Sequence, residues 1–217
     1  DRRDEAAFEA LLHRHGPTVL AVCRRIAGAG PDAEDAFQAA FLVLSRKAHV
    51  VRPRAALAGW LHGVAVRAAL KVRSKEARRR TKEREAATMP RPADAEPAGP
   101  DELAALHREL GRLPADLRAA VVLCDLEGKT RAEAARQLGW PEGTVASRLA
   151  RARRVLARRL NPAVPALGLS LVPTVVPTRL FANTLDAAAA FAAGPGKSAA
   201  AVTLAEEVIT DMLLTKL

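Results

Sequence analysis

Apolar residues recur every three or four positions through most of this chain, the spacing that places side chains on one face of an α-helix. In the N-terminal block, the clearest stripe is Phe37–Leu44. We predict that its helix starts at Asp32 as N-cap, with Asp35 in a capping-box-like position. A further helix is predicted over residues 55–85. The pattern therefore predicts a helical N-terminal domain.

Two proline-rich segments divide the rest of the chain. Residues 88–101 hold four prolines without apolar periodicity, which indicates a linker that follows a first domain at 1–87. Helical spacing resumes over 102–160, and residues 161–217 are first proline-interrupted and then periodic again. The sequence thus predicts an all-α fold: two small helical domains joined by a Pro-rich linker, the second a helix-turn-helix, plus a partly helical C-terminal tail.

Composition and charge change the picture in one respect. Aromatic residues make up only 3% of the 217 residues, which argues against an all-β fold. The net charge is +10, and residues 1–160 carry the whole excess, with 31 basic and 20 acidic side chains. The excess is densest in 71–85 and 142–160, on separate predicted helices. Two such segments favour surfaces that bind nucleic acid over helix faces whose charges only contact solvent.

The segment TRAEAARQLGWPEGTVASRL, residues 130–149, has the pattern of a helix-turn-helix. Thr130 and Glu133 form a capping box, and Gly139 tolerates the left-handed conformation that ends the first helix. The second helix fits the major groove, where arginine pairs with guanine. An ordinary helical hairpin is the alternative. The residues expected to face DNA are Thr144, Ser147, Arg148, Arg151, Arg154 and Arg158.

Three stretches resemble the extracytoplasmic-function group of bacterial RNA polymerase sigma factors. They are DAEDAFQAAFLVL, GWLHGVAVRAALKVRSKEARRR and LPADLRAAVVLCDLEGKTRAEAARQLGWPEGTVASRLARARRVLARRL, and together the resemblance covers residues 4–160. The resemblance implies a factor that binds core RNA polymerase and directs promoter-specific transcription initiation. It also implies promoter DNA as a partner and makes an anti-sigma factor a further candidate partner.

The resemblance also implies roles for particular residues. The first domain would dock on a coiled coil of the polymerase clamp and read the downstream (−10) element, and the second would read the upstream (−35) element. Family members often have an acid where this chain has Ala39. The residues that match the docking motif are Asp32, Glu34, Asp35 and Gln38. Those that fall on the −10 reading helix are Trp60, Arg67, Lys71, Arg73, Arg78, Arg79 and Arg80.

Other function classes fit the sequence less well. The histidines and cysteines lack metal-ligand spacing, and no nucleotide-binding or hydrolase motif occurs, so we expect neither an enzyme nor a cofactor. A helix-turn-helix repressor or regulator that acts without core polymerase remains an alternative. A band shift with and without core polymerase separates the two hypotheses, because a repressor binds its operator alone.

The tail breaks with the rest of the chain in charge and pattern. Residues 161–217 carry three basic and four acidic side chains and end in the apolar stripe Val202–Leu213, so we expect a regulatory or tethering segment. The candidate occupants of that stripe are the protein's own domains, a second copy, or a membrane segment beyond Leu217. The apolar stretch 163–178 holds three prolines and is too short to span a bilayer. We therefore expect a cytoplasmic protein without membrane contact in these residues.

Overall fold

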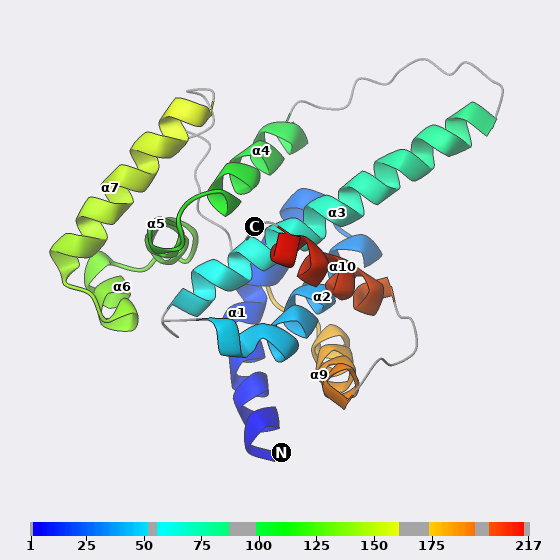
Figure 1. Cartoon of the computed structure of the whole chain (residues 1–217), viewed down its shortest axis with the longest axis horizontal. Helices are drawn as coiled ribbons and strands as arrows, with labels where there is room; N and C mark the ends of the chain where they lie inside the picture. The colour runs from blue at the N-terminus through cyan, green and yellow to red at the C-terminus, as the bar shows by residue number, and fades with distance from the viewer. Residues whose placement is uncertain (1, 52–55, 87–98, 161–173, 194–199, 215–217) are drawn as a thin grey trace.

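The computed structural model describes residues 2–51, 56–86, 99–160, 174–193 and 200–214. Within these ranges the chain forms helices and turns and contains no strand, as the all-α prediction requires. In the same ranges, no helix combines the length and the apolarity that a membrane crossing needs. Figure 1 shows two groups of helices in contact, with the last two helices lying against the first group.

The first group consists of α1 (Arg2–Ala27), α2 (Pro31–Lys47) and α3 (Leu57–Ala86), which pack against one another. The rings of Phe37 and Phe41 lie 5.0 Å apart, fully buried at the centre of this group. These aromatic side chains bury the largest apolar areas in the group, so they anchor its core. A short 3-10 turn, η1 (Ala48–Val50), follows α2.

The second group is the predicted helix-turn-helix with two preceding helices. The cap residues behave as predicted: Thr130 accepts a hydrogen bond from the Glu133 backbone amide in a full capping box, and Gly139 has φ +66°. Val145 and Leu149 are buried in the angle between the last two helices, which confirms the packing pattern. The elements are α4 (Gly99–Gly111), α5 (Ala115–Val121), η3 (Val122–Leu126), α6 (Arg131–Leu138) and α7 (Glu142–Arg159).

The two groups touch along α3. Gly59 leaves no room for a side chain, because a Cβ placed there would lie 3.0 Å from the Ala119 Cα on α5. On the next turns, the ring nitrogens His62 Nε2 and His107 Nδ1 lie 3.3 Å apart, and both rings are buried. Arg118 donates a 2.7 Å hydrogen bond to the Gly111 carbonyl oxygen from the same region. The structure therefore contains a close, partly polar contact between the two groups of helices.

The tail forms α9 (Thr178–Ala193) and α10 (Ala200–Leu214), which pack on α2, with α9 also touching α1 and α10 touching α3. The predicted stripe is only partly covered: Ala205 is buried, Val202, Ile209 and Met212 are half-buried, and Leu213 is exposed. The most deeply buried large side chains of α10 are instead Leu204 and Val208. Of the three partners considered for the tail, the one that it contacts in this structure is the protein's own first domain. The tail is thus more helical, and more closely attached, than the sequence pattern indicated.

Candidate functional site

The acidic start of α2 differs in one detail from its prediction. The N-cap is Gly30, not Asp32, and Pro31 occupies the first helical position, so no side chain caps this helix. Pro31 suits the first turn because its missing amide would have had no intrahelical partner there. Asp32 consequently lies inside the first turn, where a carboxylate is favoured by the helix dipole. The capping-box-like arrangement with Asp35 was therefore wrong.

The predicted docking residues share one edge of α2. Glu34 is exposed, and Asp32, Asp35 and Gln38 are half-buried. Partial burial raises the pKa of the Asp35 carboxyl, and the nearby charges of Asp32 and Glu34 raise it further. The edge thus presents three acids and an amide to its surroundings, which suits a basic or hydrogen-bond-donating partner.

The side of α2 that faces away from Phe37 is apolar and covered. Ala39, Val43 and Arg46 follow one another at helical spacing on that side, and the first two are fully buried. Arg46 lies over the Phe191 ring of α9, 3.6 Å from its centroid, and donates a hydrogen bond to the Phe191 carbonyl oxygen. The tail therefore covers the outer side of the helix whose edge carries the predicted docking residues.

The candidate −10 residues divide into two sets along α3. Trp60, Arg67 and Lys71 are half-buried in the part of the helix that packs against other elements. The Lys71 ammonium bonds to Asp211 of α10 at 2.5 Å. Farther along, the helix extends away from the rest of the chain, as Figure 1 shows. Arg73 is half-buried, whereas the exposed members there are Arg78, Arg79 and Arg80.

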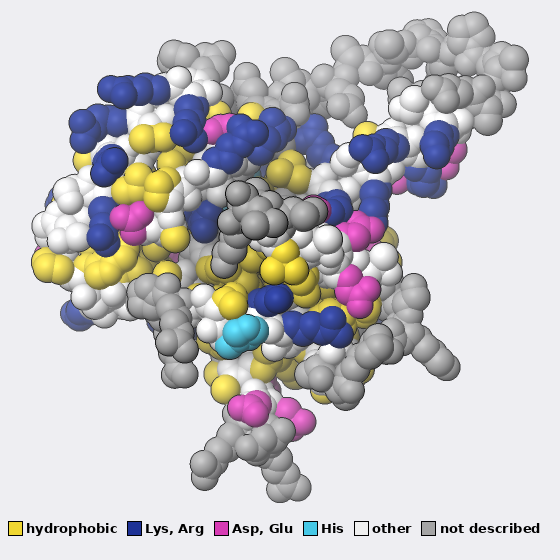
Figure 2. All heavy atoms as spheres, viewed as in Figure 1, with side chains coloured by type: hydrophobic (Ala, Val, Ile, Leu, Met, Phe, Trp, Pro, Cys, Tyr) yellow, Lys and Arg dark blue, Asp and Glu magenta, His cyan; other side chains and the backbone are white. Residues whose placement is uncertain are grey.

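The outer part of α3 is basic but internally paired. Arg79 Nε lies 2.8 Å from a Glu76 oxygen, and Arg80 Nε lies 3.0 Å from the other. These hydrogen bonds lower the pKa of the Glu76 carboxyl to about 2. Exposed pairs of this kind are weak and exchange readily with other anions. Figure 2 shows Lys and Arg side chains gathered on this part of α3 and, separately, over α7.

The second basic surface lies on α7, whose buried stripe turns the remaining side chains outward. Ser147, Arg151, Arg154 and Arg158 are exposed, and Thr144 is half-buried. Each exposed arginine lies three or four residues from the next, so the three share one face. This face has the spacing and charge that a helix in the major groove requires.

Arg148 is held more firmly than the sequence suggested. Its guanidinium lies 3.9 Å from the centre of the Trp140 ring, and its Nε lies 3.3 Å from an Asp116 oxygen. Stacking on an indole and pairing with a carboxylate both fix an arginine in one orientation. The sequence placed Arg148 among the outward residues but gave no sign of these two partners, because Asp116 is 32 residues away in the chain.

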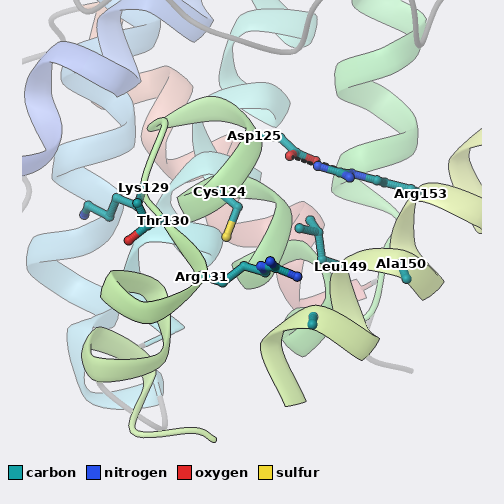
Figure 3. A pocket seen from close by; sticks show the side chains of 9 residues that line it. Cys124, Asp125, Lys129, Thr130, Arg131, Leu149, Ala150 and Arg153 are labelled. Atoms are coloured by element: carbon teal, nitrogen blue, oxygen red, sulfur yellow. Dashed lines mark hydrogen bonds and ion pairs between the residues drawn. The ribbon is translucent and has the colours of Figure 1, made fainter. Parts of the chain in front are cut away.

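A cavity of about 420 Å³ opens beside the helix-turn-helix, which the sequence analysis missed. Figure 3 shows that η3, the start of α6 and the inner side of α7 surround it. The pKa of the Cys124 thiol there is raised by partial burial and by the Asp125 charge. Two of its cations are already engaged, because Arg153 donates hydrogen bonds to both Asp125 oxygens and Lys129 donates to Glu127 and Gln137. The charged lining residues are Asp125, Lys129, Arg131 and Arg153.

The described residues offer no group of three His, Cys, Asp or Glu side chains that could hold a metal ion. Cys23 is buried in the first group of helices, and burial raises the pKa of its thiol. Cys124 is likewise a free thiol.

Comparison with known proteins gives two family matches along the chain. The model described as Sigma-70 region 2 matches residues 11–79, and the model described as Sigma-70, region 4 matches residues 103–156. The first match contains α2 and most of α3, and the second contains most of α4 and the helices up to α7. The two candidate surfaces therefore fall in different matched regions.

Individual relatives agree with these matches. The chain is 40% identical over 160 residues to ECF RNA polymerase sigma factor SigM of Mycobacterium tuberculosis, covering 73% of this chain and 79% of that protein. It is 28% identical over 173 residues to the ECF RNA polymerase sigma-E factor of Escherichia coli, covering 74% and 90%. A solved complex of the sigma factor RpoE with the anti-sigma factor NepR from Bartonella quintana has 23% identity and a TM-score of 0.31, covering 70% and 95%.

Proposed function

We propose how this chain, which belongs to the extracytoplasmic-function group of RNA polymerase sigma factors, uses the surfaces described above. As a sigma factor it binds core bacterial RNA polymerase and directs promoter-specific transcription initiation, and it is not an enzyme. What remains to be assigned is the role of each residue. The observation that carries the assignment is the presence of two basic helix surfaces in separate regions, with an acidic edge on α2 that precedes both in the sequence.

The acidic edge of α2 is assigned to polymerase docking. Asp32, Glu34 and Asp35 supply negative charge, and Gln38 supplies an amide that both donates and accepts hydrogen bonds. Such an edge recognises a basic helical partner through pairs at its rim and apolar contact at its centre. The family's docking motif aligns with the same four positions.

The exposed face of α3 is assigned to the −10 element. Trp60 and Arg67 lie in the first, more deeply buried part of α3, and Lys71 and Arg73 follow toward its exposed end. The outer arginines at positions 78, 79 and 80 are suited to backbone phosphate, because Glu76 holds two of them only by exposed pairs. On this proposal, α3 positions the strand mainly through charge, since Trp60 is the one aromatic side chain on this helix.

The exposed face of α7 is assigned to the −35 element. Thr144 and Ser147 lie in the first two turns of α7, where recognition helices contact base edges, and Arg151 follows one turn later on the same side. Arg154 and Arg158 continue toward the end of α7 and are placed for phosphate. Arg148 can contact DNA only if its guanidinium first leaves the Asp116 carboxylate.

The wider assignment follows from these roles. Residues 1–87 form the docking and −10 domain, 102–160 form the −35 domain, 88–101 link them, and 161–217 form a regulatory or tethering tail. The proposed place of action is the cytoplasm, where bacterial transcription occurs, and an anti-sigma factor that covers either domain is a further proposed partner. Family membership disfavours the alternative of a repressor that acts without polymerase.

Substitution on α2 tests the docking assignment. The double variant Asp35→Lys with Gln38→Lys places two positive charges on the proposed edge, so its affinity for core polymerase should fall. Glu5→Lys is the matched control, because Glu5 is an exposed acid on α1 outside the edge. Core binding is measured by titrating labelled chain with core enzyme. Equal affinity of the double variant and the control would place the docking surface elsewhere.

A further inference from the structure

The inference concerns the tail and rests on the proposed docking role of α2. In the structure, α9 and α10 lie against α2, and Figure 1 shows them on the side of the first helix group opposite the second group's α7. Charged contacts join the tail to this group. Arg46 pairs with Glu206 at 3.9 Å and Lys75 with Glu207 at 2.7 Å, and Lys71 lies 2.5 Å from Asp211 and 3.8 Å from Glu207.

The charge pattern of these contacts is one-sided. Every basic partner belongs to α2 or α3, and every acidic partner belongs to α10. Glu206, Glu207 and Asp211 are three of the four acids in residues 161–217, so the tail's negative charge is concentrated on this contact. Lys71 is also proposed to bind promoter DNA, and here its ammonium is engaged by a carboxylate instead of a phosphate. The acidic face of α10 therefore occupies part of a surface assigned to a polyanion.

The apolar part of the contact involves the docking helix. Ala39 and Val43 are fully buried beneath the tail side of α2, although they point away from the Phe37 core. An exposed helix face is normally polar, so an apolar one implies a covering partner. In a sigma factor that face adjoins the edge proposed to bind the polymerase. The tail and the proposed polymerase-binding edge thus occupy adjoining sides of the same helix.

We infer that α9–α10 is a built-in competitor that covers the side of α2 next to the polymerase-docking edge and the Lys71 end of the DNA surface until core polymerase displaces it. The contact is suited to displacement. Its ion pairs are partly exposed, with side-chain exposures of 26% at Lys71 and 53% at Lys75, and such pairs are weak. A protein whose binding-competent form is only a fraction of the population shows an affinity reduced by that fraction.

Charge reversal on the tail tests the inference in the full chain. The variant Glu207→Lys with Asp211→Lys replaces attraction by repulsion at Lys71 and Lys75, while both positions lie outside the proposed binding surfaces. Because each exposed pair shifts an equilibrium by about twofold to fivefold, core polymerase should half-saturate this variant at roughly tenfold lower concentration. Asp186→Lys is the matched control, since Asp186 is an exposed acid on α9. It should bind core polymerase like the native chain.

A charge swap tests whether the gain comes from the contact itself. Lys75→Glu added to Glu207→Lys restores an attractive pair between α3 and α10, so the affinity for core polymerase should return toward the native value. Circular dichroism establishes that each variant keeps its helical content. If the charge-reversed chain binds no more tightly than Asp186→Lys, or if the swap restores nothing, the inference is wrong. If no form of the chain binds core polymerase, the proposed docking role fails instead.

Discussion

The contact between the two helix groups yields a prediction whose size follows from the structure. Gly59→Ala adds one methyl group to α3 at a point where its carbon would lie 3.0 Å from the Cα and 3.1 Å from the nitrogen of Ala119. These are backbone atoms of α5, so no side chain can turn aside, and α5 must move. Overpacking of this kind costs about 1–3 kcal/mol.

The higher helix propensity of alanine opposes this steric cost. Alanine is favoured over glycine inside a helix by about 0.5–1 kcal/mol. The steric cost exceeds this gain, so the free energy of unfolding should fall by about 1 kcal/mol overall. Gly143→Ala on α7 is the matched control, because nothing lies within 4 Å of its added carbon. It should raise the free energy of unfolding by up to about 1 kcal/mol.

Urea denaturation of the three full-length chains measures both effects. We expect the midpoint of Gly59→Ala to lie below that of the native chain, and the midpoint of Gly143→Ala to lie above it. If Gly59→Ala stabilises the chain as much as Gly143→Ala does, then α3 and α5 are not in close contact in solution, and the packing described for the two groups is wrong.

The same contact bears on promoter recognition. The −10 and −35 elements lie about 25 base pairs apart, or about 85 Å along B-form DNA. Packed helices lie about 8–10 Å apart, so α3 and α7 are only about 20 Å apart through α5. If α3 and α7 read these two elements as proposed, they cannot do so at that separation, so this assignment requires the contact to open on the promoter. Gly59→Ala should therefore preserve initiation, which in vitro transcription beside the native chain checks.

Four further predictions concern stability and DNA binding. The free energy of unfolding should fall as the pH drops from about 6.5 through 4, because burial lowers the pKa of His15 and His107 to about 4 and that of His62 well below its usual value, so that the folded state resists their protonation; replacing all three with glutamine should flatten this dependence in urea titrations. Thr130→Ala removes the capping box and should cost about 1 kcal/mol by the same assay. Arg151→Ala should relax sequence preference at one position of the −35 element by about 1–3 kcal/mol in competition binding, and equal losses on all sequences would contradict a base contact. Arg158→Ala should weaken all sequences alike and lower the salt dependence of binding by about one unit.

Local sequence signals predicted much of the architecture. The helix-turn-helix could be placed because its capping box, its left-handed glycine and its buried stripe all lie within residues 130–149. The error at the start of α2 was also local. Asp32 is a good N-cap residue, but Pro31 already fixes the first helical position.

The contacts between distant segments could not be predicted from local pattern. Lys71 and Asp211 are 140 residues apart, and nothing near either position indicates the other. Helical spacing places Arg148 on the outward side of its helix, but it does not show that Trp140 and Asp116 lie against the side chain. Charge distribution did predict that the tail differs from the DNA-reading blocks. It could not predict which surface the tail covers, since that depends on packing between distant elements.

The most direct test of the central claim is run-off transcription on genomic fragments with core polymerase, with and without the purified chain. We expect discrete transcripts that depend on the chain and whose start sites share upstream and downstream sequence elements. Replacing Asp35 and Gln38 together should reduce these transcripts, and the Glu5→Lys control should not. If the chain yields no transcript beyond those of core polymerase alone, or binds its DNA sites equally well without core polymerase, it does not act as the sigma factor described here.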